Sequence, residues 1–71
     1  MNWQEIIYML YSIDSDDRNF AYGIIIANFN ILDEFIKFDI RNILNGFLEN
    51  EMFMDDQEYL NIVNSLHLLE L

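Results

Sequence analysis

Residues 17–29 read DRNFAYGIIIANF, and the choice between helix and strand for this segment settles the fold class. As a helix it would be apolar on nearly every face, which is typical of a helix that is buried all round. Three consecutive isoleucines are β-branched, so a strand over 20–29 is the competing interpretation. The acidic turn at 14–17 suits a helix N-terminus, and more than ten residues is long for a strand. We therefore expect a helix over 17–29, with an α+β fold as the alternative.

Helical patterns lie on both sides of this segment. The first helix is expected to start near Asn2, whose spacing from Glu5 suits a capping box, and its apolar face extends to Ile13. The third helix is expected to be capped by Asn30, and its apolar stripe consists of Leu32, Ile36, Ile40, Ile43, Leu44 and Phe47. Gly46 would either end this helix or weaken it from inside.

A fourth helix begins at Asp55 or Asp56, because Asp55 and Glu58 again have capping spacing. Its apolar face repeats every three or four residues and consists of Tyr59, Ile62, Val63, Leu66 and Leu69. The chain is therefore predicted to be all-α: a single domain over 1–71 that forms a small three- or four-helix up-and-down bundle.

Composition narrows the classes of function. The 71 residues include 13 acids, three bases and no cysteine, for a formal net charge of −10. The length leaves room for one domain, and the lack of cysteine excludes disulfides and thiolate metal sites. The charge disfavours nucleic acid and anionic membranes as direct ligands and favours a basic protein surface as the partner.

The acids gather in two places. Eight of the 13 lie in two short stretches: Asp14, Asp16, Asp17, Glu49, Glu51, Asp55, Asp56 and Glu58. In an up-and-down bundle the first and third connections meet at the same end, so the two stretches would form one acidic, partner-binding pole. The alternative is that these acids are helix caps and solubilising charge.

Apolar residues suggest two further contacts. Phe53, between Met52 and Met54, is either an interface anchor or a lid over the end of the bundle. At 54% hydrophobic, the chain holds more apolar residues than so small a core can bury. We therefore expect a homo-oligomer that associates through the second helix, where the small residues Gly23 and Ala27 permit close approach. The residues expected to mediate self-association are Tyr22, Gly23, Ile26 and Ala27.

No constellation predicts catalysis, a metal site or a cofactor. Asp14-x-Asp16 resembles the start of a calcium loop, but Asn19 and Ile25 stand where a glycine and a bidentate glutamate are needed. His67 has no second histidine or cysteine to work with, and no serine lies in a G-x-S-x-G context. We therefore expect a non-enzymatic protein.

Residue usage, with 11 Ile, nine Asn and no Thr, is typical of AT-rich coding sequence, as in low-GC bacteria, their phages and mobile elements. In size and charge the chain resembles the small acidic inhibitors of phages and mobile elements, anti-CRISPR-like proteins included, although no aligned motif carries this resemblance. No signal peptide is recognisable, and the longest apolar run, 20–29, would span roughly 15 Å as a helix, half a bilayer. We therefore expect a cytoplasmic location.

The expected function is a protein–protein interaction module that blocks a basic, nucleic-acid-binding surface of a host defence complex or nucleic-acid enzyme by imitating phosphates. Two alternatives stay open: a self-associating structural or regulatory subunit, and an immunity protein or antitoxin against a basic nuclease toxin.

Overall fold

The structure, a computed structural model, describes residues 2–71 and is built from helices alone over that range. They are α1 (Trp3–Leu10), α2 (Ser15–Asn28), the short 3-10 helix η1 (Phe29–Ile31), α3 (Glu34–Glu49) and α4 (Asp56–Leu69). The all-α prediction is confirmed. The α+β alternative is wrong, since residues 20–29 lie in α2 and the first residue of η1.

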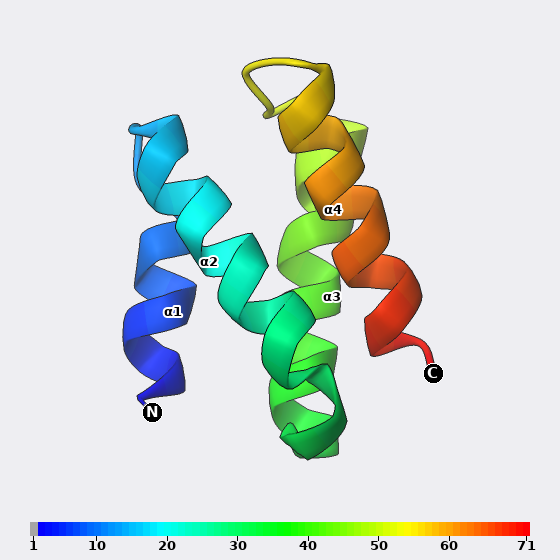
Figure 1. The fold of residues 1–71 in the computed structure, drawn as a ribbon. Coiled ribbons are helices and arrows are strands. Elements are labelled where there is room, and N and C mark those ends of the chain that lie inside the picture. The colour runs from blue at the N-terminus through cyan, green and yellow to red at the C-terminus, as the bar shows by residue number, and fades with distance from the viewer. Residues whose placement is uncertain (1) are drawn as a thin grey trace.

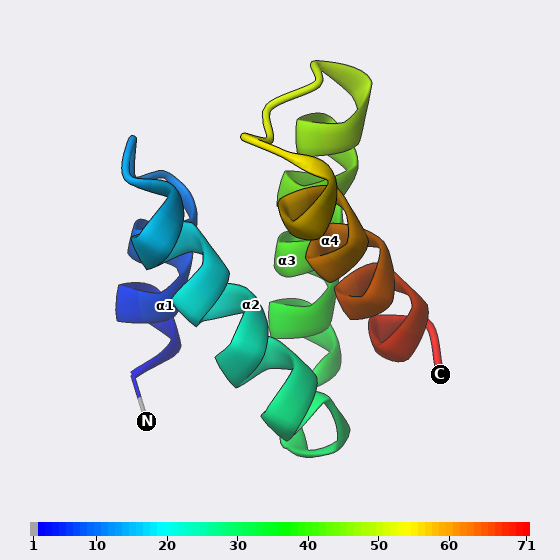
Figure 2. The same ribbon diagram turned by 45° about the horizontal axis from the view of Figure 1, so that its top comes forward.

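The four α-helices run alternately up and down (Figure 1). α2 packs on both α1 and α4, and α3 packs on α4. The α1–α2 turn and the α3–α4 loop lie at the same end of the molecule in both views (Figures 1 and 2), and η1 lies at the other end. This arrangement confirms the up-and-down bundle. No helix within residues 2–71 has both the length and the hydropathy needed to cross a bilayer.

Helix α2 forms because its start is capped and its inner face is buried. The Asp14 carboxylate accepts a hydrogen bond of 2.9 Å from the Asp16 N–H, and Ala21, Tyr22 and Ile25 are buried. The outer face is open, however, and Gly23 is exposed. Neighbouring helices of this one chain therefore cover only part of the circumference of α2, and burial all round would need a second chain.

The core joins all four α-helices. α3 contributes its predicted stripe, with Ile40, Leu44 and Phe47 buried. The other buried hydrophobic residues are Ile6, Leu10, Ala21, Tyr22, Ile25, Leu32, Ile62, Leu66 and Leu69. Twelve other large hydrophobic side chains within residues 2–71 are exposed, so the apolar surplus expected from the composition does lie on the surface.

The end of α1 and the start of α3 differ from the prediction, and α2 spans Ser15–Asn28 in place of 17–29. α1 ends at Leu10, so Ile13 lies beyond the helix and is 97% exposed. Asn30 lies inside η1 and does not cap α3; Asp33 does, accepting from the Ile36 N–H at 2.9 Å. The reason is Leu32, which is buried in an extended conformation, so that the chain re-enters a helix only after it.

Candidate functional site

We call the end of the bundle that carries the two connections, residues 11–18 and 49–58, the acidic end (Figure 1). It holds eight carboxylates and one base, Arg18, so that a net charge of −7 out of the molecule's −10 lies there. Seven of these acids are exposed: Asp14, Asp16, Asp17, Glu49, Glu51, Asp55 and Asp56. The two acidic stretches, distant in sequence, therefore belong to the same end of the fold.

The eighth acid, Glu58, is completely buried. Its carboxylate accepts hydrogen bonds from Arg18 Nε (2.7 Å) and Nη2 (2.9 Å) and from the Tyr22 hydroxyl (2.7 Å). It also accepts from the Met54 N–H at 2.7 Å. The interpretation of Glu58 as a partner-binding surface acid is therefore wrong: its four hydrogen bonds are all internal, and nothing of it reaches solvent.

These contacts determine the ionisation of the cluster. Burial raises the pKa of Glu58, but the hydrogen bonds from Arg18, Tyr22 and the Met54 N–H outweigh burial and hold the pKa below its ordinary value. Burial, and then the hydrogen bond to Glu58, raise the pKa of Tyr22. The pKa of Arg18 is raised, chiefly by its hydrogen bond to Glu58. At neutral pH the cluster is an ion pair with a neutral phenol.

Arg18 also ties the two connections together. Its Nη1 donates to the Ser12 carbonyl oxygen at 2.9 Å, while its Nε and Nη2 donate to the carboxylate of Glu58 at the start of α4. One side chain of α2 therefore sets the position of the α1–α2 turn relative to α4. Sequence reasoning overlooked this role, because Arg18 and Glu58 lie 40 positions apart and only the fold brings them together.

The other bases do not neutralise the acidic end. Lys37 lies 3.8 Å from Glu34 at the opposite end of α3, and Arg41 donates to the Leu69 carbonyl oxygen at 3.0 Å. Within the part of the chain that the structure describes, Arg18–Glu58 and Lys37–Glu34 are the ion pairs. The seven exposed acids therefore present nearly uncompensated negative charge.

Helix capping explains some of these acids. Asp14 caps α2, and Asp55 caps α4 by accepting from the Glu58 N–H at 2.9 Å. Asp17 accepts from the Ser12 hydroxyl at 2.9 Å. The side chains of the remaining four form no hydrogen bond or ion pair within residues 2–71: Asp16, Glu49, Glu51 and Asp56. Local structure therefore accounts for only part of the acidic end.

The α3–α4 loop starts with a strained residue. The Met52 N–H donates to the Phe47 carbonyl at 2.8 Å and the Glu51 N–H to that of Leu48 at 3.3 Å, which is a Schellman C-cap. The motif puts Glu51 at φ 52°, a left-handed conformation that glycine normally supplies. Gly46, which could have ended the helix, lies inside α3.

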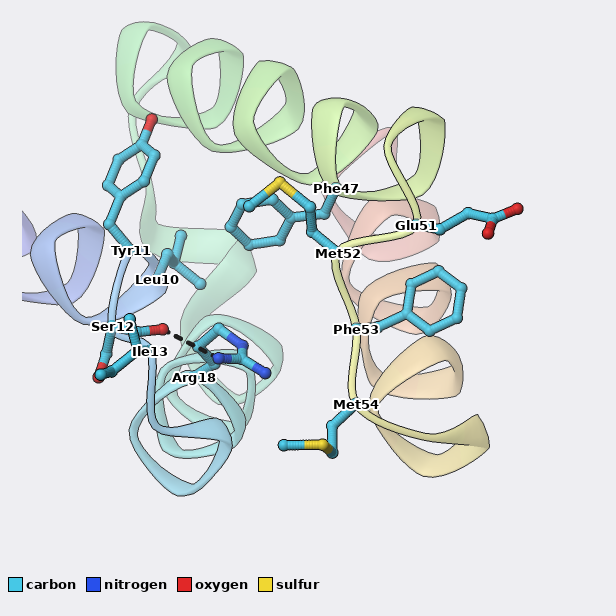
Figure 3. A pocket seen from close by; sticks show the side chains of 10 residues that line it. All are labelled: Leu10, Tyr11, Ser12, Ile13, Arg18, Phe47, Glu51, Met52, Phe53 and Met54. Atoms are coloured by element: carbon cyan, nitrogen blue, oxygen red, sulfur yellow. Dashed lines mark hydrogen bonds between the residues drawn. The ribbon is translucent and has the colours of Figure 1, made fainter.

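Beyond Glu51, the loop divides its apolar side chains between the core and the surface. The Phe53 ring lies 5.4 Å from that of Tyr59 and packs against the core as the lid alternative proposed. In Figure 3 it points away from the hollow between the two connections. Met52 and Met54 are exposed, and their side chains extend toward that hollow.

This hollow is an apolar pocket of about 360 Å³ between the two connections (Figure 3). Arg18, with its bond to Ser12, lies at the pocket's base. The lining residues are Leu10, Tyr11, Ser12, Ile13, Arg18, Phe47, Glu51, Met52, Phe53 and Met54. Sequence reasoning missed the Leu10–Ile13 wall because Ile13 was assigned to a helix face.

The residues expected to mediate self-association are not equally accessible. Tyr22 is completely buried and cannot contribute, which corrects that part of the prediction. Ile26 is half-buried, whereas Gly23 and Ala27 are exposed, as is Phe20 on the same face.

Comparison of the chain with protein-family models, with curated proteins and with solved structures gives no match.

Proposed function

We propose that this protein is a cytoplasmic, non-enzymatic inhibitor that docks its acidic end on a basic, nucleic-acid-binding protein surface and blocks it. The single observation that carries the proposal is the position of seven exposed carboxylates at one end of the fold. Four of them, Asp16, Glu49, Glu51 and Asp56, have no capping or pairing role within residues 2–71. Such an array imitates the closely spaced charges of a phosphate backbone.

Concentrated charge acts mainly on the rate and specificity of encounter. A surface of one sign steers a partner of opposite sign and repels others. Because all three bases have internal partners, the acidic end offers little that would repel a cationic surface. Phages and mobile elements use small acidic inhibitors in this way against host defence complexes and nucleic-acid enzymes, and we place this chain in that class of action.

The test is charge reversal confined to the acidic end. In Asp16→Lys/Glu49→Lys/Asp56→Lys, three exposed acids that hold no structural hydrogen bond are reversed. The matched control, Glu5→Lys/Asp39→Lys/Glu70→Lys, has the same net charge but changes exposed residues away from the acidic end. Asp55 and Glu58 are left intact, because one caps α4 and the other is buried.

The wild type, the acidic-end variant and the control are each immobilised. Partners are captured from a lysate of the native host cells and identified by mass spectrometry. We expect the wild type and the control to retain the same nucleic-acid-binding protein, and the acidic-end variant to lose it. Association should also slow markedly between about 50 mM and about 500 mM salt, because screening weakens steering. Equal capture by all three proteins would contradict the proposal.

A further inference from the structure

We infer that the pocket between the two connections receives a large apolar side chain of the basic partner, so that the acidic end binds a cationic segment that carries an apolar anchor. This inference rests on the proposed function, because the partner's positive charge is taken from it. It adds a specificity element that charge alone does not provide.

The pocket has the chemistry of an anchor site. Around its opening, Tyr11 is 63%, Ile13 97%, Met52 54% and Met54 66% exposed, so that two apolar side chains come from each connection (Figure 3). Its volume of about 360 Å³ lies near the lower limit for ligand pockets, ~300–1,000 Å³, which suits one or two side chains. Interface energy typically concentrates in aromatic or aliphatic residues that enter such pockets.

The pocket is also pre-formed. Arg18 donates to the Ser12 carbonyl in one wall and to the Glu58 carboxylate, and Glu58 in turn accepts from the Met54 N–H in the other wall. Both walls are therefore fixed through the same buried ion pair. A site that is ordered before binding loses less conformational entropy when the partner enters.

Charge complementarity identifies the occupant. The exposed acids of both connections lie at the same end of the molecule as the pocket, and the Glu51 carboxylate points outward from the hollow (Figure 3). A neutral apolar ligand would make no use of these carboxylates, and an acidic one would be repelled by them. A protein segment that presents Lys or Arg on either side of an apolar residue matches both features.

The test uses two synthetic peptides to distinguish the pocket's contribution to binding from that of the charge. One consists of Lys and Arg residues around a single central Trp, and the other has Ala in place of that Trp. Ile13→Ser/Met54→Ser removes apolar area from both walls at constant charge. The matched control, Ile31→Ser/Phe35→Ser, removes exposed apolar side chains that do not line the pocket. Because all four residues are exposed, both variants should fold, and circular dichroism checks that they do.

Affinities are measured by fluorescence anisotropy. We expect the Trp peptide to bind the wild type and the control at least about tenfold more tightly than the Ala peptide, which corresponds to an anchor worth about 1.4 kcal/mol or more. In Ile13→Ser/Met54→Ser this preference should fall to about twofold or less. The acidic-end variant, Asp16→Lys/Glu49→Lys/Asp56→Lys, should bind both peptides more weakly than the wild type, and by the same factor for each.

Failure of this inference is distinguishable from failure of the proposed function. Equal binding of the two peptides to the wild type, or a preference that survives in Ile13→Ser/Met54→Ser, would overturn the pocket's role while leaving acidic docking intact. Peptide binding that is unaffected by reversing the acidic end would contradict acidic docking itself. Absence of any binding by either peptide would overturn the inference.

Discussion

Glu58 determines how the acidic end is held together. Removing one member of a buried ion pair leaves the other charged and unpaired, at a cost of about 3–5 kcal/mol. We therefore expect Glu58→Gln to lower the free energy of unfolding by about 3 kcal/mol at pH 7. The double variant Arg18→Met/Glu58→Gln should lose less than the sum of its single variants, since it leaves no unpaired guanidinium. Urea unfolding followed by circular dichroism measures the free energy of unfolding of each variant. If the losses of the two single variants simply added up in the double variant, the pairing of Arg18 with Glu58 would be contradicted.

The same residue predicts a pH dependence. Because the pKa of Glu58 is lower in the folded protein than its ordinary value, the unfolded state takes up the proton first as the pH falls. The stability that Glu58 contributes is therefore complete above the ordinary glutamate pKa of about 4.3 and is lost as the pH drops below it. The stability difference between the wild type and Arg18→Met/Glu58→Gln should shrink between about pH 5 and pH 2. A difference that stays constant over this range would show that Glu58 is not ionised in the folded state.

Glu51 lies in a backbone conformation that its side chain disfavours. At φ 52°, a non-glycine residue costs of order 1 kcal/mol. We expect Glu51→Gly to raise the free energy of unfolding by about 0.5–1 kcal/mol. Glu51→Ala removes the same charge but keeps the Cβ atom, so it should show little of this gain. Glu51→Gly also removes one of the exposed acids of the acidic end, so this variant should be more stable yet bind the basic peptides less tightly.

At the scale of the element, the start of α3 depends on Asp33. Its carboxylate accepts the Ile36 N–H at 2.9 Å, whereas Asn30 lies in η1, where no side chain forms a cap. Replacing a capping acid by alanine typically costs about 1 kcal/mol. We therefore expect Asp33→Ala to destabilise the protein by about that amount, while Asn30→Ala changes stability by a few tenths. Thermal unfolding distinguishes the two, and equal losses would contradict the assignment of the cap.

Helices were predictable where local chemistry and hydrophobic period agreed. Asn2, Asp14 and Asp55 all cap the helices that follow them. The predicted stripe of α3 faces the core, with Ile40, Leu44 and Phe47 buried and the other α3 members packed against them. The prediction of an Asn30 cap was wrong because Leu32 is buried in an extended conformation, so that α3 starts only after Asp33.

The candidate site was only partly predictable. Up-and-down connectivity was enough to place the two acidic stretches at one end. That Glu58 is buried could not be read locally, because its spacing from Asp55 also fits a surface capping box. The pocket likewise depends on the distance between two connections that are remote in sequence.

For the whole molecule, two kinds of association should respond to salt in opposite directions. Docking on a basic partner weakens as salt screens attraction. Association between copies that each carry a net charge of −10 instead strengthens, because screening removes repulsion. The face of α2 that carries Phe20, Gly23 and Ala27 is exposed, and we expect weak self-association through it. Light scattering at high micromolar concentration should show a larger mean mass at about 500 mM than at about 50 mM salt.

Two glycines provide the matched variants for this test. A Cβ atom added at Gly23 or at Gly46 meets no neighbour within 4 Å, so either alanine variant should stabilise its helix by about 0.5–1 kcal/mol. Only Gly23 lies on the exposed face of α2, where an added methyl group would separate two helices in close contact. Gly23→Ala should therefore reduce the mean mass at high salt, and Gly46→Ala should not. A wild type that is monomeric at both salt concentrations would contradict self-association through this face of α2. Each monomer would then present a single acidic end to its partner.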